Sequence, residues 1–229
     1  MPAINLARLK TQAIRLSEKF HEPDGFIHEL NEMLDYYTNR TIRSTQIARR
    51  LSLPTYRTPR PVLRQIQAEL QPLAGIHSMD AIALTNALWK AGSLEARLLA
   101  ACLLGSIPLA QAIPSLARLP EWLAQSSDKE VQSALLTDSF SRLRRENPES
   151  FFLLLEEWLK SPRNSLQAWG LRALIPMLTD PTFENLPTVF RILRPAITFA
   201  GPVTQLDLQA CIATLEKVSR TETQAYLRN

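Results

Sequence analysis

The sequence predicts an all-α protein, and three features of its composition support this. The 229-residue chain holds only 6 Gly against 16 Pro. Sheet proteins with many tight turns use more Gly, whereas Pro suits helix starts and the corners between helices. Val is scarce beside Leu and Ala, which again favours helix over strand. An apolar content of 45% and a charged content of 21% are ordinary for a folded globular protein.

The first 77 residues predict an irregular helical cap. Helices are expected at residues 4–20 and 26–37, then a short helix at 42–51 and a loop that contains Pro54 and Pro59. Pro61 begins the next predicted helix, which runs to about Leu70. A terminal cap is expected to differ from inner repeats because its outer face meets water.

Residues 78–218 read as regular helical hairpins. Helices are expected at 78–89 and from 94 past 102, followed by one that ends at Trp122 and one over 128–145. Asn147 is the expected cap of a helix whose apolar stripe has the 3.6-residue period. The apolar stripes of the last four helices comprise Phe151, Leu154, Leu155, Trp158 and Leu159; Leu166, Trp169, Leu171, Leu174 and Ile175; Phe190, Leu193 and Ile197; and Leu208, Cys211, Ile212 and Leu215. Residues 219–229 are expected to form a tail.

One short sequence recurs at a fixed distance. Ser93–Ala96 reads Ser-Leu-Glu-Ala and Ser165–Ala168 reads Ser-Leu-Gln-Ala, an offset of 72 residues or two units of 36. Degenerate helical pairs with such a period are typical of α-solenoids. We therefore expect residues 1–229 to form a single domain of HEAT-like antiparallel hairpins, wound as a right-handed α-α superhelix.

Several functional classes are disfavoured by what the sequence lacks. The longest apolar run, Phe151–Leu155, is far shorter than the roughly 20 residues that span a bilayer, and residues 1–8 do not resemble a secretory signal. Cys102 and Cys211 lie on apolar faces, so two buried thiols in a reducing, cytoplasmic protein are expected. Nucleophile motifs and glycine-rich phosphate loops are lacking, so we expect no cofactor.

Arginine carries most of the positive charge. The net charge is +4, and 20 of the 26 basic residues are Arg, which suits planar contacts with phosphate. Residues 40–64 hold seven arginines and no acid, which indicates a surface that binds anions. The candidate nucleic-acid-binding residues are Arg49, Arg50, Arg57, Arg60 and Arg64, with Tyr56 for base stacking and Arg142, Arg145 and Arg172 elsewhere. The alternative is that these arginines pair with acids of neighbouring helices or are solvated surface charges.

Histidine and tryptophan residues offer two other kinds of binding group. His28 and Glu32 lie four residues apart, a spacing that metal ligands can use, but an exposed histidine on an acidic helix is the preferred interpretation, and no metal is expected. The four tryptophans (89, 122, 158 and 169) could stack on bases, although packing between repeats is the preferred role. The expected partners are DNA, through its phosphates, or a protein segment in the groove of the solenoid.

Three stretches of this chain resemble the DNA alkylation repair family of HEAT-like glycosylases. They are the Pro-x-Leu-Arg-x-Ile segment within Tyr56–Ile66, the hairpin from Leu88 to Ala100 with its Glu-x-Arg-x-x-Ala sequence, and the turn from Trp158 to Asn164. The resemblance covers roughly residues 55–180. It implies a helical-repeat fold and a protein that acts on alkylated DNA bases.

The resemblance also implies catalytic residues, and this sequence departs from them. The family's Trp position falls near Lys129, its Asp position near Ser133, and its Arg pair near Ala168-Trp169, with only Arg172 close by. In the family the carboxylate stabilises the developing oxocarbenium charge. We therefore expect a non-catalytic relative that binds the DNA backbone. The remaining candidates for an active glycosylase are two displaced carboxylates, Asp138 and Asp128.

Overall fold

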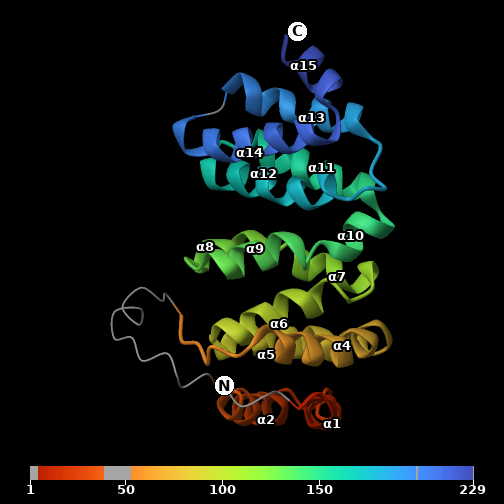
Figure 1. The fold of residues 1–229 in the computed structure, drawn as a ribbon, viewed down its shortest axis with the longest axis vertical. Helices are drawn as coiled ribbons and strands as arrows, with labels where there is room; N and C mark the ends of the chain where they lie inside the picture. Colours follow the sequence, from red (N-terminus) through yellow and green to blue (C-terminus); the bar gives the residue numbers. More distant parts are fainter. Residues whose placement is uncertain (1–4, 39–52, 200, 229) are drawn as a thin grey trace. The chain divides into compact units, whose positions relative to one another are not determined.

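The computed structural model describes residues 5–38, 53–199 and 201–228, and the chain is mostly helical in these ranges (Figure 1). No strand occurs in them, which confirms the predicted all-α class. Within the same ranges, no helix is long and apolar enough to cross a membrane. The chain divides into two compact units, Met1–Arg142 and Leu143–Asn229, and each is described by itself.

The N-terminal unit packs its helices in two layers. In one layer α1 contacts α4, α4 contacts α6, and α6 contacts α9; in the other, α2 contacts α5 and α5 contacts α7. Helix α8 packs on α9. The helices are α1 (Leu6–Ser17), α2 (Pro23–Tyr36), α4 (Arg60–Ile76), α5 (Ser78–Ala91), α6 (Leu94–Leu104), α7 (Leu109–Leu116), α8 (Leu119–Gln125) and α9 (Lys129–Thr137). Helix α10 (Ser141–Glu146) spans the boundary between the units.

The C-terminal unit repeats this arrangement on a smaller scale. Helix α11 packs on α12 and α13, while α12 packs on α14, and α14 on α15. The helices are α11 (Pro148–Lys160), α12 (Asn164–Leu178), α13 (Leu186–Phe199), α14 (Pro202–Val218) and α15 (Arg220–Arg228).

Short polar side chains fix where several helices begin. The predicted cap Asn147 accepts a hydrogen bond from the Ser150 amide at 3.0 Å, with Pro148 in the first turn. Ser93 accepts one from the Ala96 amide at 3.2 Å and so starts α6. Each cap satisfies an amide that has no partner within its own helix.

The structure corrects three helix boundaries. The helix expected over 128–145 ends at Thr137 and resumes at Ser141. The helix expected to end near Leu70 continues to Ile76 despite Pro72. Residues 219–229 contain α15 rather than a tail. The short helix expected at 42–51 lies outside the described residues.

Several hydrogen bonds between helices join residues that are 36 apart in the chain, within a range of 31 to 40. In the N-terminal unit, Trp89 Nε1 donates to Gln125 Oε1 and Ser141 Oγ donates to the Gly105 carbonyl, and both pairs are 36 residues apart. In the C-terminal unit, Tyr226 donates to the Phe190 carbonyl, also 36 residues away. This separation equals the repeat length that the sequence predicts.

Candidate functional site

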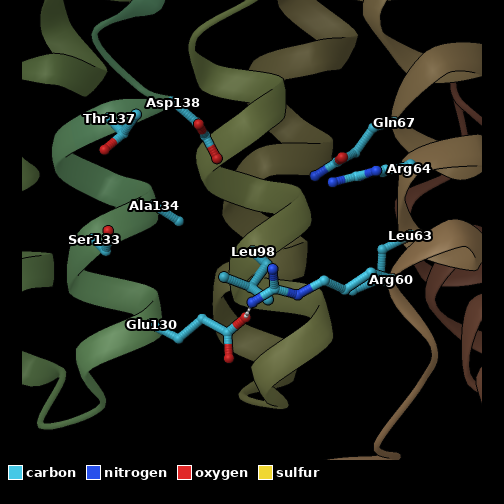
Figure 2. A pocket seen from close by; sticks show the side chains of 10 residues that line it. All are labelled: Arg60, Leu63, Arg64, Gln67, Leu98, Glu130, Ser133, Ala134, Thr137 and Asp138. Atoms are coloured by element: carbon cyan, nitrogen blue, oxygen red, sulfur yellow. Dashed lines mark ion pairs between the residues drawn. The ribbon is translucent and has the colours of Figure 1, made fainter. Parts of the chain in front are cut away.

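Residues of three helices in the N-terminal unit line an open groove of about 320 Å³ (Figure 2). Helices α4 and α9 form its two walls, and Leu98 of α6 lies between them. The lining residues are Arg60, Leu63, Arg64, Gln67, Leu98, Glu130, Ser133, Ala134, Thr137 and Asp138. On each wall they recur at intervals of three or four residues, the spacing that places side chains on one face of a helix.

The α4 wall supplies the groove's positive charge. Arg60 reaches toward α9, where its Nη2 lies 3.7 Å from Oε1 of Glu130 (Figure 2). The two side chains are 80% and 51% exposed, so this pair holds Arg60 only weakly. Arg64 is exposed one turn further along and, among the described residues, takes part in no ion pair. Both guanidiniums are therefore accessible to an anion.

The loop before α4 is held by a buried carboxylate, which sets where that wall begins. Glu95 of α6 is only 2% exposed, and its Oε1 accepts hydrogen bonds from Thr55 Oγ1 at 2.8 Å and from the Thr58 amide at 3.2 Å. The Leu94 amide also donates to the Pro54 carbonyl at 2.9 Å. Sequence reasoning missed this role of Glu95. Its signal was the single acid in the helix that begins at Leu94, which is apolar apart from Glu95 and Arg97.

Tyr56 and Arg57 lie on this loop rather than on the groove wall. Both side chains are half-buried, and neither lines the groove. Arg57 has a positive φ of 54°, unusual for a residue other than glycine, and its amide donates to Thr55 Oγ1 at 3.0 Å. The loop conformation thus places these two residues beside the start of α4.

The α9 wall contributes the negative charge and contains one of the two candidate carboxylates. Asp138 follows the last residue of α9 and lines the groove opposite Arg64 and Gln67 (Figure 2). Ser133, which the family resemblance aligned with a catalytic Asp, lines the same groove. Lys129, aligned with the family's Trp, is an exposed residue at the start of α9.

Close contact between two backbones fixes the position of Asp138. An added Cβ on Gly105, at the end of α6, would lie 1.8 Å from the Asp138 carbonyl oxygen, so only glycine fits there. Around this contact, Ser141 Oγ donates to the Gly105 carbonyl at 3.0 Å and Arg142 Nη1 donates to the Ser106 carbonyl at 2.8 Å. The tertiary contact ends α9 early and holds Asp138 at the edge of the groove.

The second candidate carboxylate, Asp128, is a helix cap. Its Oδ1 accepts hydrogen bonds from the Glu130 amide at 2.9 Å and the Val131 amide at 3.2 Å, and it does not line the groove. These bonds satisfy two amides at the start of α9. The structure therefore gives Asp128 a structural role.

The other predicted arginines are not gathered at the groove. Arg142 donates to a backbone carbonyl, as described above, and Arg145 lies 3.7 Å from Glu146 in the C-terminal unit. Arg172, in the same unit, makes a bidentate pair with Asp207 at 2.7 and 3.1 Å. Arg49 and Arg50 lie outside the described residues. Of the predicted set, the groove contains Arg60 and Arg64.

The tryptophans are core residues. Trp89, Trp122, Trp158 and Trp169 are each at most 8% exposed, which confirms packing rather than an open stacking platform. Trp89 and Trp122 stack at 4.4 Å between ring centroids, and the Arg97 guanidinium lies over the Trp89 ring, 4.5 Å from its centroid. Burial of Arg97 lowers its pKa.

The cysteines and His28 also lie as predicted. Cys102 and Cys211 are buried and unbonded to each other. His28 is 77% exposed, with its Nε2 3.4 Å from Glu32, so it belongs to a solvated helix face.

Comparison with protein-family models, curated proteins and solved structures finds no match for this chain.

Proposed function

We propose that this chain is a HEAT-like helical repeat protein that binds the DNA backbone through the groove between α4 and α9. The observation that carries the proposal is the pair of accessible guanidiniums of Arg60 and Arg64 on one wall of that groove. Arginine is the side chain best suited to bidentate contact with phosphate oxygens.

The spacing of the two arginines is compatible with a phosphate backbone. Residues four apart on a helix are displaced by about 6 Å along its axis. Both side chains therefore lie on the same side of α4, close enough to contact neighbouring phosphates of one strand. In the sequence, both arginines belong to the stretch 40–64, which holds seven arginines and no acid.

The repeat architecture is part of the same proposal. Its support is the two-layered helix packing within each unit and several hydrogen bonds between helices at separations of 35 or 36 residues. Stacked hairpins offer an extended surface on which a backbone can lie.

Fluorescence anisotropy with a labelled DNA duplex at about 50 mM salt tests the proposal. We expect Arg60→Ala and Arg64→Ala each to weaken binding, and the double variant to weaken it further. Arg172→Ala is the matched control, because that guanidinium is already paired with Asp207. Absence of binding by the unaltered chain would contradict the proposal. Nuclease-resistant capture of a protein partner would then favour an interaction scaffold.

A second candidate function, excision of alkylated bases, is favoured by the position of Asp138. Its carboxylate lines the same groove as the two arginines, so a bound backbone would bring a sugar near a negative charge. An ionised carboxylate there would stabilise an oxocarbenium-like transition state. Release of 7-methylguanine or 3-methyladenine from alkylated DNA, abolished in Asp138→Asn, would support this function. Binding without release would assign the groove to binding alone.

A further inference from the structure

Two histidines and an aspartate meet at one end of the first two hairpins. His21 lies in the turn after α1, His77 joins α4 to α5, and Asp80 lies in the first turn of α5. One potential ligand atom from each residue lies within 4.8 Å of the other two. His21 Nδ1 is 2.7 Å from Asp80 Oδ2, and the two imidazole centroids are 4.7 Å apart at 83°.

The fold holds these three residues in place. Helix α1 packs on α4, and α2 packs on α5, so the turns that join the helices of each hairpin lie close together. Phe20, fully buried, anchors the residue before His21. The His77 amide donates to the Leu73 carbonyl at 2.7 Å, and the His77 carbonyl accepts from the Ala81 amide at 2.9 Å. The cluster therefore follows from the packing of the hairpins.

We propose that His21, His77 and Asp80 form a binding site for a divalent transition-metal ion, most suitably Zn²⁺. Two imidazole nitrogens and one carboxylate oxygen are a donor set that zinc takes, and three protein ligands leave a fourth position for water. The residues are partly exposed, so an ion can reach them. The nearest cation along the chain, Lys19, is paired with Glu22 at 3.1 Å, which offsets its repulsion of a metal.

The geometry needs only a small adjustment to bind the ion. Zinc–nitrogen bonds of about 2.1 Å place tetrahedral ligand atoms about 3.4 Å apart. The separations of up to 4.8 Å between ligand atoms would therefore close by at most about 1.4 Å, and the 2.7 Å between His21 Nδ1 and Asp80 Oδ2 would widen by about 0.7 Å. Rotation of partly exposed side chains can supply such a movement. The ion would take the place of the hydrogen bond between His21 and Asp80, and each imidazole would bind the ion through one nitrogen and carry a proton on the other.

A bound ion would connect the first hairpin to the second. His21 belongs to the α1–α2 hairpin, whereas His77 and Asp80 belong to α4 and α5. An ion that binds only the folded arrangement raises stability with its concentration. The site is separate from the groove, which is lined by residues 60–67 of α4 rather than by its C-terminal end.

Calorimetric titration of the untagged, EDTA-treated full chain with ZnCl₂ tests the proposal. We expect saturable binding of one ion per chain and a rise in the melting temperature that EDTA reverses. His77→Ala and Asp80→Asn should each weaken binding at least tenfold. His28→Ala is the control, because that exposed histidine lies 3.4 Å from Glu32 and outside the cluster.

Co²⁺ gives a readout that needs no variant. Its visible absorption reports a low-coordinate nitrogen and oxygen site in the unaltered chain, and competition with Zn²⁺ should remove the signal. Lack of saturable uptake by the unaltered chain would overturn the proposal. An equal loss of affinity in His28→Ala and His77→Ala would also overturn it, because binding would then not depend on the cluster.

Discussion

Replacement of Gly105 by alanine should destabilise the N-terminal unit and displace Asp138. The new Cβ would lie 1.8 Å from the Asp138 carbonyl oxygen and 2.8 Å from its carbonyl carbon, whereas ordinary contacts begin at 3.4 Å. Both neighbouring atoms are backbone, so no side-chain rotation relieves the clash. The ends of α6 and α9 must therefore separate by more than an ångström.

The magnitude follows from the clash and from the hydrogen bonds that it would break. Overpacking of this kind costs about 1–3 kcal/mol. Separation of the helices would also break the bonds from Ser141 to the Gly105 carbonyl and from Arg142 to the Ser106 carbonyl. Each contributes about 1 kcal/mol, so the expected loss in the free energy of unfolding is roughly 3–5 kcal/mol.

Urea denaturation followed by circular dichroism measures this loss, with Gly75→Ala as the control. Gly75 lies in α4, and an added Cβ there meets nothing within 4 Å. Alanine in place of an unhindered helical glycine stabilises by up to about 1 kcal/mol. Equal midpoints for Gly105→Ala and Gly75→Ala would refute the close contact between α6 and α9.

Two further predictions concern buried side chains: the carboxylate of Glu95, and the thiols of Cys102 and Cys211. Glu95→Ala should lower the free energy of unfolding by about 2–4 kcal/mol, because Thr55 and the Thr58 amide lose their shared acceptor, and trypsin should then cleave faster at Arg57. Unchanged stability and cleavage would contradict that role. Burial raises the pKa of Cys102 to about 11 and that of Cys211 to about 12, from the usual 9.0, so both thiols should resist iodoacetamide at pH 8 until the chain is denatured. Rapid labelling of the native chain would contradict this protection. Since the folded thiols lose their protons at higher pH than the unfolded ones, the free energy of unfolding should decline as pH rises from about 9 through these pKa values.

The sequence predicted helices best where an apolar stripe recurs. The stripes of α11 and α12 were visible because most of their apolar residues are buried, on one face of α11 and around most of α12. The break after Thr137 was not visible, because its cause is the contact of Asp138 with Gly105, which is 33 residues away. Helix α15 was missed since its nine residues have little apolar content, and it is held instead by Thr223 and by the bond from Tyr226 to the Phe190 carbonyl.

Residues of the candidate sites could likewise be predicted only where the signal lies in neighbouring residues of the sequence. Arg60 and Arg64 could be named as candidates from the sequence, because a run of arginines without nearby acids is a local feature. The role of Glu95 could not, because its partners lie 37 and 40 residues away. The His21–His77–Asp80 cluster was missed for a similar reason, since spacing motifs find ligands on one helix or turn, whereas His21 and Asp80 are 59 residues apart.

The salt dependence of DNA binding tests the proposed function most directly. Each phosphate that a guanidinium neutralises adds about 0.9 to the slope of log K against log salt concentration. The unaltered chain should therefore show a steep negative slope, and the Arg60→Ala/Arg64→Ala double variant a slope that is shallower by about two, while Arg172→Ala leaves it unchanged. Equal slopes for the unaltered chain and the double variant would contradict the account, because the groove would then take no part in holding the phosphates.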